Sequence, residues 1–132
     1  MKIAGKRGLL VREGPRGRGV FATRSFAEGE TVEVCPTVEI SEGGGDLADY
    51  LFESTNEGMF LVVLGFGMLY NHSSEANLDY YQGDGSTLEF VAQRRIDRGE
   101  ELTISYGDEW WSARGETPVS YTHLTLPTIL RV

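Results

Sequence analysis

Short segments of β-type sequence separated by glycine turns constrain the fold of this chain more than any other feature. The sequence has 17 glycines in 132 residues, about twice the roughly 7% average, and glycine is favoured in turns that need a positive φ. Segments rich in β-branched and aromatic residues lie between these turns, at residues 9–12, 19–24, 31–34, 78–81, 87–92 and 101–106. This arrangement predicts a mainly β domain.

Four local expectations follow from this pattern. The strand at residues 31–34 continues toward Ile40, and Pro36, which lacks an amide proton, is expected to break it or place it at a sheet edge. Asp46 is expected to cap a short helix over residues 47–52. The apolar run at residues 59–64 predicts a strand buried on both faces. Residues 83–86 predict the turn of a hairpin.

Two segments of the sequence resemble each other. Residues 25–32 and residues 95–102 each contain an apolar residue, a polar turn that ends in Gly-Glu, and the start of a strand. Gly29 and Gly99 supply the positive φ that such turns favour. The resemblance predicts that one kind of turn is used twice.

Charge and cysteine content narrow the function classes. A formal net charge of −8 argues against nonspecific nucleic-acid binding, which needs a basic face. It is compatible with a basic protein partner, or with solubility alone. The single cysteine, Cys35, excludes a disulfide framework and a zinc cluster of thiolates within this chain. We expect no metal site, because His72 has no well-placed second ligand.

The sequence has no transmembrane-length apolar run and no signal-peptide core at its start. We therefore expect an intracellular, soluble protein of the cytoplasm or a host nucleus, with no membrane partner. We expect one domain over residues 1–116. Residues 117–132 change composition and contain Pro118 and Pro127, so we interpret them as a non-native or disordered tail.

Three motifs, far apart in the sequence, carry the functional signal. They are GRGVFA at residues 17–22, NHSSEAN at residues 71–77 and GEELTISYG at residues 99–107, with DYLF at residues 49–52 between the first two. In this order they resemble the SET-domain family over roughly residues 9–111. Ser74, Ala76 and Ser105 depart from the usual cysteine, proline and aspartate, and Arg18 replaces a residue that is often aromatic.

The resemblance implies a SET-domain β-clip fold, with small curved sheets and a C-terminal pseudoknot beneath the loop that contains Asn71 and His72. It is closest to the minimal viral members, which lack a cysteine-rich zinc segment and form homodimers. It also implies an S-adenosylmethionine-dependent protein-lysine N-methyltransferase that acts on a basic protein or peptide such as a histone tail. The alternatives are a non-catalytic SET-like binding module and a methyltransferase of a non-histone protein.

The family also implies roles for individual residues. Tyr106 would be the catalytic residue, orienting the target amine, whereas by itself it resembles an ordinary tyrosine at a strand end. The residues implied to bind the cofactor are Arg16, Gly17, Arg18, Tyr50, Asn71, His72 and Trp110. Without the motifs, residues 16–18 would be a plain turn, the Asn-His pair would be turn chemistry, and Tyr50 and Trp110 would be packing residues.

Overall fold

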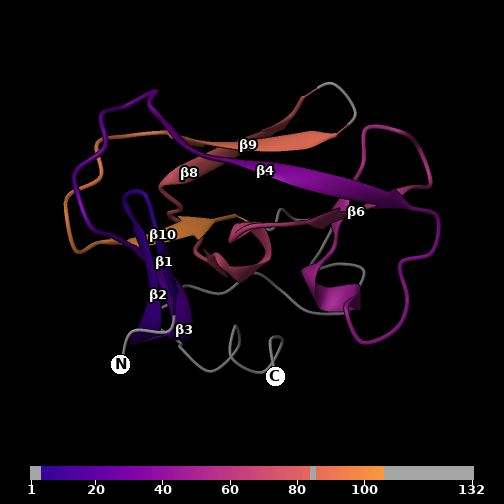
Figure 1. Cartoon of the computed structure of the whole chain (residues 1–132), viewed down its shortest axis with the longest axis horizontal. Coiled ribbons are helices and arrows are strands. Elements are labelled where there is room, and N and C mark those ends of the chain that lie inside the picture. The colour runs from indigo at the N-terminus through magenta and orange to yellow at the C-terminus, as the bar shows by residue number, and fades with distance from the viewer. Residues whose placement is uncertain (1–3, 84–85, 106–132) are drawn as a thin grey trace.

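The computed structural model describes residues 4–83 and 86–105, which form two five-stranded sheets (Figure 1). The first contains β1 (Ala4–Lys6), β2 (Leu9–Gly14), β3 (Gly17–Ala22), β7 (Asn71–His72) and β10 (Glu101–Ile104), in the order β1-β2-β3-β10-β7. The second contains β4 (Thr31–Ile40), β5 (Phe52–Glu53), β6 (Phe60–Val63), β8 (Leu78–Gln82) and β9 (Thr87–Ala92), in the order β5-β6-β4-β9-β8. The helices, η1 (Ala48–Tyr50) and η2 (Gly67–Leu69), are single 3-10 turns. The prediction of a mainly β domain is confirmed.

One hydrophobic core is shared by the two sheets. Alternating residues of each strand point inward, such as Val11 and Val20 from the first sheet and Leu61 from the second. Tyr70 and Phe90 lie near the centre, both fully buried, with ring centroids 4.7 Å apart. Burial of such side chains stabilises the fold by about 1.5–3 kcal/mol each.

Strand β10 joins parts of the chain that are distant in sequence. It pairs antiparallel with β3, where Leu102 lies opposite Val20, and parallel with β7, where Ile104 lies opposite His72. The ladder continues beyond β7, because the amide of Ser73 donates to the carbonyl of Ile104 at 2.9 Å. Strand β10 therefore holds the first and second sequence motifs on either side of the third.

The two similar segments form equivalent turns that lie side by side at one end of the molecule (Figure 1). Gly29 has φ +83° and Gly99 has φ +93°. In the first turn the carboxylate of Glu30 accepts the amide of Ala27 at 3.0 Å. In the second, Glu100 accepts the amide of Asp97 at 2.6 Å. The prediction that one kind of turn is used twice is confirmed.

The expectation for Pro36 is wrong. Strand β4 runs through Pro36 without a break and lies inside its sheet, between β6 and β9. The carbonyl of Pro36 accepts the amide of Leu64 at 2.9 Å, and Leu64 directly follows the end of β6. The missing N–H of the proline therefore faces the end of a neighbouring strand, where only one ladder hydrogen bond is lost.

Two further expectations are corrected. In β6, Leu61 and Val63 are buried but Phe60 and Val62 are only partly buried, so the strand is buried on one face. The sheet has the core on one side only, and continuous apolar sequence cannot reveal this. Asp46 does not cap the helix: η1 begins after Leu47 with no side-chain cap. The hairpin prediction is confirmed by the pairing of β8 with β9.

Several predictions lie outside the described residues. They include the boundary between residues 116 and 117, the end of the last predicted strand at Tyr106, and the threading of the C-terminal pseudoknot. Among the residues that the structure describes, no helix has the length and apolar character needed to cross a membrane.

Candidate functional site

The side chain of Asn71 connects the three sequence motifs. Asn71 is 1% exposed, and its amide nitrogen donates to the carbonyl of Arg18 at 2.9 Å and to Oε2 of Glu101 at 2.8 Å. These two bonds use both protons of the amide group. A bound molecule would therefore meet Asn71 through its main chain, with the side chain holding that main chain in place.

Glu101 is the centre of this arrangement. Its other oxygen, Oε1, forms an ion pair of 2.6 Å with Arg16, and the two side chains are only 5% and 13% exposed. A buried ion pair is favourable only when its geometry is good. Removal of one partner lowers stability strongly, because the other charge stays buried without compensation. The Arg16 guanidinium thus ties the turn between β2 and β3 to β10.

Two glycines let the backbone adopt this geometry. Gly17 has φ +82° at the turn, a conformation that side-chain-bearing residues rarely adopt. At Gly19 an added Cβ would lie 2.2 Å from Oε2 of Glu101 and 3.0 Å from Nδ2 of Asn71. The absence of a side chain at residue 19 therefore allows the carboxylate to lie directly against β3.

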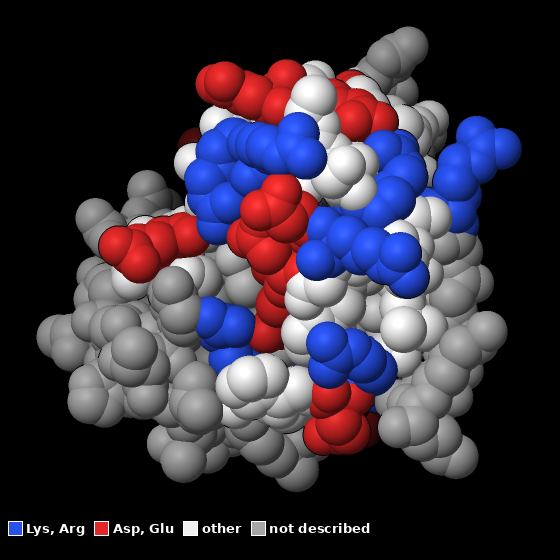
Figure 2. Space-filling model, turned by 90° about the vertical axis from the view of Figure 1, so that its left-hand side faces the viewer, with Lys and Arg blue, Asp and Glu red and all other residues white. Residues whose placement is uncertain are grey.

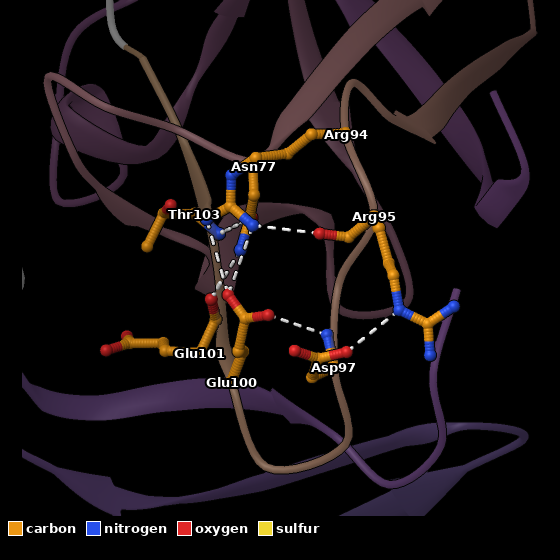
Figure 3. Close-up of polar contacts among 7 residues, drawn as sticks. All are labelled: Asn77, Arg94, Arg95, Asp97, Glu100, Glu101 and Thr103. Carbon is orange, nitrogen blue, oxygen red and sulfur yellow. Dashed lines mark hydrogen bonds and ion pairs between the residues drawn. The ribbon is translucent and has the colours of Figure 1, made fainter. Parts of the chain in front are cut away.

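Asn77 closes the second motif onto β10 (Figure 3). It is 2% exposed; its Nδ2 donates to the carbonyl of Glu101 and its Oδ1 accepts the amide of Thr103, both at 2.9 Å. The rigid proline common before this asparagine in the family is Ala76 here, yet Asn77 still makes both bonds. Figure 3 also shows Arg94 reaching Glu100, and Arg95 reaching Asp97, in the adjoining turn.

A buried carboxylate braces the segment that leads into β7. Glu33 is 5% exposed and accepts the hydroxyl of Tyr70 at 2.6 Å and the amide of Phe66 at 3.0 Å. These donors lie at the two ends of the η2 turn. Burial, together with the negative charge of Glu33, raises the pKa of Tyr70 well above its ordinary value. The hydroxyl therefore stays protonated and remains a donor at neutral pH.

The structure brings together five of the predicted cofactor residues. Arg16, Gly17 and Arg18 form the turn that contacts Asn71, and His72 is 2% exposed in β7 next to β10. Tyr50 is partly buried at the end of η1, and its place at the site stays a prediction. Tyr106 and Trp110 lie outside the described residues. The last described residue is Ser105, which directly follows β10.

Two important residues did not stand out in the sequence. Glu101 belongs to the third motif, but nothing in the spacing indicates that its carboxylate crosses to Arg16 and Asn71. Glu33 lies in an alternating segment, where strict alternation would place it on the face opposite Val32. A register irregularity between Thr31 and Glu33 instead buries both Val32 and Glu33.

Comparison with known proteins gives consistent results. Residues 17–107 match the SET domain family model. The chain is 33% identical over 113 residues to the histone-lysine N-methyltransferase, H3 lysine-37 specific, of Schizosaccharomyces pombe, with 78% of this chain and 76% of that protein covered. It is 27% identical over 86 residues to histone-lysine N-methyltransferase SET9 of Gibberella zeae, covering 65% of this chain and 13% of that longer protein.

A solved structure extends the comparison to three dimensions. The crystal structure of a candidate histone methyltransferase of Plasmodium falciparum superposes with a TM-score of 0.68 at 30% sequence identity. The match covers 81% of this chain and 99% of the other. The motifs at residues 17–22, 71–77 and 99–107 all fall within the family match.

Proposed function

Because this chain belongs to the SET-domain family and is a protein-lysine methyltransferase, we propose that it binds S-adenosylmethionine between the turn at residues 16–18 and Asn71-His72. The observation that carries this proposal is the bond from Asn71 to Arg18, which joins two motifs that lie far apart in the sequence. The group that the cofactor supplies is a methyl carried on a positively charged sulfur.

The residues present fit such a ligand. Gly17 has the positive φ of a bare turn, and bare turns let a ligand approach backbone groups closely. The main chains of Asn71 and His72 are fixed by β10 and by the Asn71 side chain. Such fixed N–H and C=O groups suit the carboxylate and ammonium of the amino-acid part of the cofactor. Tyr50 and Trp110 complete the proposed set, as aromatic residues suited to a flat or cationic group.

The acceptor chemistry explains the proposed role of Tyr106. A lysine amine has an ordinary pKa of about 10.4 and must be neutral to attack. Desolvation in an apolar channel lowers the pKa of an amine, and so does a neighbouring positive charge. The hydroxyl of Tyr106 would hold the neutral nitrogen in line with the methyl group, which is mainly an effect of alignment.

We propose that the substrate is a histone, with the tail of histone H3 as the first candidate. The name of the Schizosaccharomyces pombe relative specifies histone H3, and the net charge of −8 favours a basic substrate. A histone substrate would place the enzyme in the cytoplasm or nucleus. Homodimer formation and special closeness to the minimal viral members stay predictions.

Transfer of a labelled methyl group tests the proposal. Wild-type protein is incubated with labelled S-adenosylmethionine and histone H3, beside Tyr106→Phe and the control Tyr80→Phe, which alters a partly buried tyrosine on β8. We expect Tyr106→Phe to lower kcat by about 10²-fold or more while calorimetry shows unchanged cofactor affinity. Absence of transfer by the wild type, or equal transfer by Tyr106→Phe, contradicts the proposal. Cofactor binding without transfer to any basic protein would favour a binding module.

A further inference from the structure

Exposed apolar side chains gather on one face of the second sheet. Among the described residues, the large exposed apolar side chains are Val34, Val38, Leu47, Leu64 and Tyr81. Val34 and Val38 alternate along β4 with exposed Pro36 between them, so all three point away from the core. We call the surface formed by Val34, Pro36, Val38, Val62, Leu64 and Tyr81 the outer face.

The strand register shows that these residues are neighbours. Val38 lies directly opposite Val62, and the amide of Leu64 bonds to the carbonyl of Pro36. On the other side of β4, Val34 lies opposite Glu89, which in turn lies opposite Tyr81. Directly opposed side chains have Cβ atoms about 4.5–5.5 Å apart. The outer face is therefore a stripe of mostly apolar side chains, with Glu89 between Val34 and Tyr81, and such exposed apolar stripes mark interaction sites more often than isolated residues do.

Among the residues that the structure describes, the charged side chains on and beside this stripe are acidic. Glu89 lies within it, and Asp79 and Glu53 point from β8 and β5 toward the same side as Tyr81 and Phe60. From Thr31 to Gln93 the sequence contains no lysine or arginine. Basic side chains gather instead at the end formed by β1–β3 and the two equivalent turns, where they alternate with acidic ones (Figure 2).

This distribution selects the kind of partner. Nucleic acids and anionic lipid surfaces would be repelled by the negative charges that the described residues place on this face. A second copy of this chain that paired through its own outer face would bring the same acidic charges against it. A polypeptide segment with lysine or arginine beside apolar residues matches both the stripe and its acidic surroundings.

We propose that the outer face is a docking surface for a basic segment of the protein substrate, separate from the stretch that carries the target lysine. This inference rests on the proposed function. Docking at a second surface raises the affinity for a long substrate without any new contact at the reaction centre. The docking surface would then distinguish whole basic proteins from short peptides.

Steady-state kinetics test this inference. The double variant Val34→Lys/Val38→Lys adds two positive charges to the stripe, and Val34→Thr/Val38→Thr removes apolar surface at unchanged charge. The matched control, Thr23→Lys/Ser25→Lys, adds the same charge at two exposed positions, one just before and one at the start of the first equivalent turn. The substrates are full-length histone H3 and a short H3 peptide that the wild type methylates.

For full-length H3 we expect the lysine variant to raise KM about 10-fold, one tenfold step in affinity, and the threonine variant to raise it less. For both variants kcat and the KM for the short peptide stay within about 2-fold of wild type, and the control behaves as wild type. An unchanged KM for full-length H3 overturns the inference, as does an equal change for both substrates. A wild-type dimer that the lysine variant converts to a monomer, seen by sedimentation, would make the outer face a self-interface and also overturn it.

If the wild type methylates neither substrate, the proposed function has failed, and fluorescence anisotropy with labelled H3 still tests the outer face. Weaker H3 binding by the lysine variant, with the control unchanged, supports docking. Equal binding by wild type and variant overturns it.

Discussion

The main chains of Phe26 and Ile96 exchange two hydrogen bonds, each 2.9 Å long, and so join the two equivalent turns face to face. Around this pair, the amide of Gly29 donates to Ala92 at 2.7 Å, and that of Gly99 donates to Ala22 at 2.8 Å. Each turn therefore bonds to the strand that precedes the other. An approximate two-fold relationship thus links the start of β4 with the start of β10, the strand that carries Glu101.

The glycines of the two turns give a direct test of this relationship. An added Cβ meets nothing within 4 Å at Gly29 or at Gly99, so only the positive φ opposes a side chain. We expect Gly29→Ala and Gly99→Ala each to lower the free energy of unfolding by about 1–2 kcal/mol, and the asparagine variants by less. Urea unfolding measures both. Losses that differ widely between the two turns would show that they are not equivalent.

Glu101→Gln tests the centre of the site. A glutamine keeps one acceptor oxygen but presents an NH₂ group to either Arg16 or Asn71, both of which are donors. We expect a loss of about 1–3 kcal/mol in stability and at least tenfold weaker binding of S-adenosylmethionine by calorimetry. Glu100→Gln, the neighbouring substitution in the exposed turn, serves as the control and leaves affinity unchanged. Equal affinities for the two variants would mean that Glu101 does not position the site.

Gly19→Ala tests the close approach of Glu101 to β3. The new methyl group would lie 2.2 Å from Oε2 of Glu101, so the carboxylate must shift from the position in which it accepts the Asn71 amide. We expect cofactor affinity to fall by tenfold or more, one step of about 1.4 kcal/mol. Gly44→Ala, where an added Cβ meets nothing within 4 Å, is the matched control. Wild-type affinity in Gly19→Ala would show that the site tolerates displacement of the carboxylate.

Two variants of Glu33 are expected to lose different amounts of stability. Glu33→Leu leaves the amide of Phe66 and the hydroxyl of Tyr70 without this acceptor, at a cost of about 1–3 kcal/mol each. Glu33→Gln can still accept from Phe66 and donate to the Tyr70 oxygen, so its loss should stay near 1 kcal/mol. Denaturant unfolding compares the two. A glutamine variant as unstable as the leucine variant would contradict the proposed bracing.

The pH dependence of stability tests the hydrogen bonds of Glu30 in the first equivalent turn. The hydrogen bond from Arg24, with that from the amide of Ala27, holds the pKa of Glu30 below its ordinary value of 4.5. Because the folded-state pKa is the lower one, this stabilisation is present above pH 4.5 and is lost as the pH falls through the folded-state pKa. The difference in Tm between wild type and Glu30→Gln should therefore be larger at pH 7 than at about pH 2.5. Glu28→Gln, one position from Gly29, controls for net charge; an unchanged difference across this range would refute the prediction.

The sequence allowed prediction of the short strands, the repeated turn and the motif order, because each depends on local residue type. Prediction from the sequence failed where the result depends on neighbouring strands or on residues distant in the chain. Pro36 is tolerated inside a sheet because β6 ends beside it, and residues 59–64 are buried on one face because only one face has a core. The roles of Glu33 and Glu101 depend on hydrogen-bond and ion-pair partners that are distant in the chain. Local sequence patterns do not predict such partners.

The position of β10 between β3 and β7 has a consequence for biosynthesis. The main chains of those two strands do not pair with each other, so a nascent chain that stopped before Glu100 would lack both the strand between them and the Glu101 carboxylate that holds the Asn71 side chain. Ribosomes must therefore release the chain beyond Ile104 before the proposed cofactor site can assemble. Products truncated before β10 are expected to be inactive. Their incompletely paired strands would make them substrates of quality-control proteases.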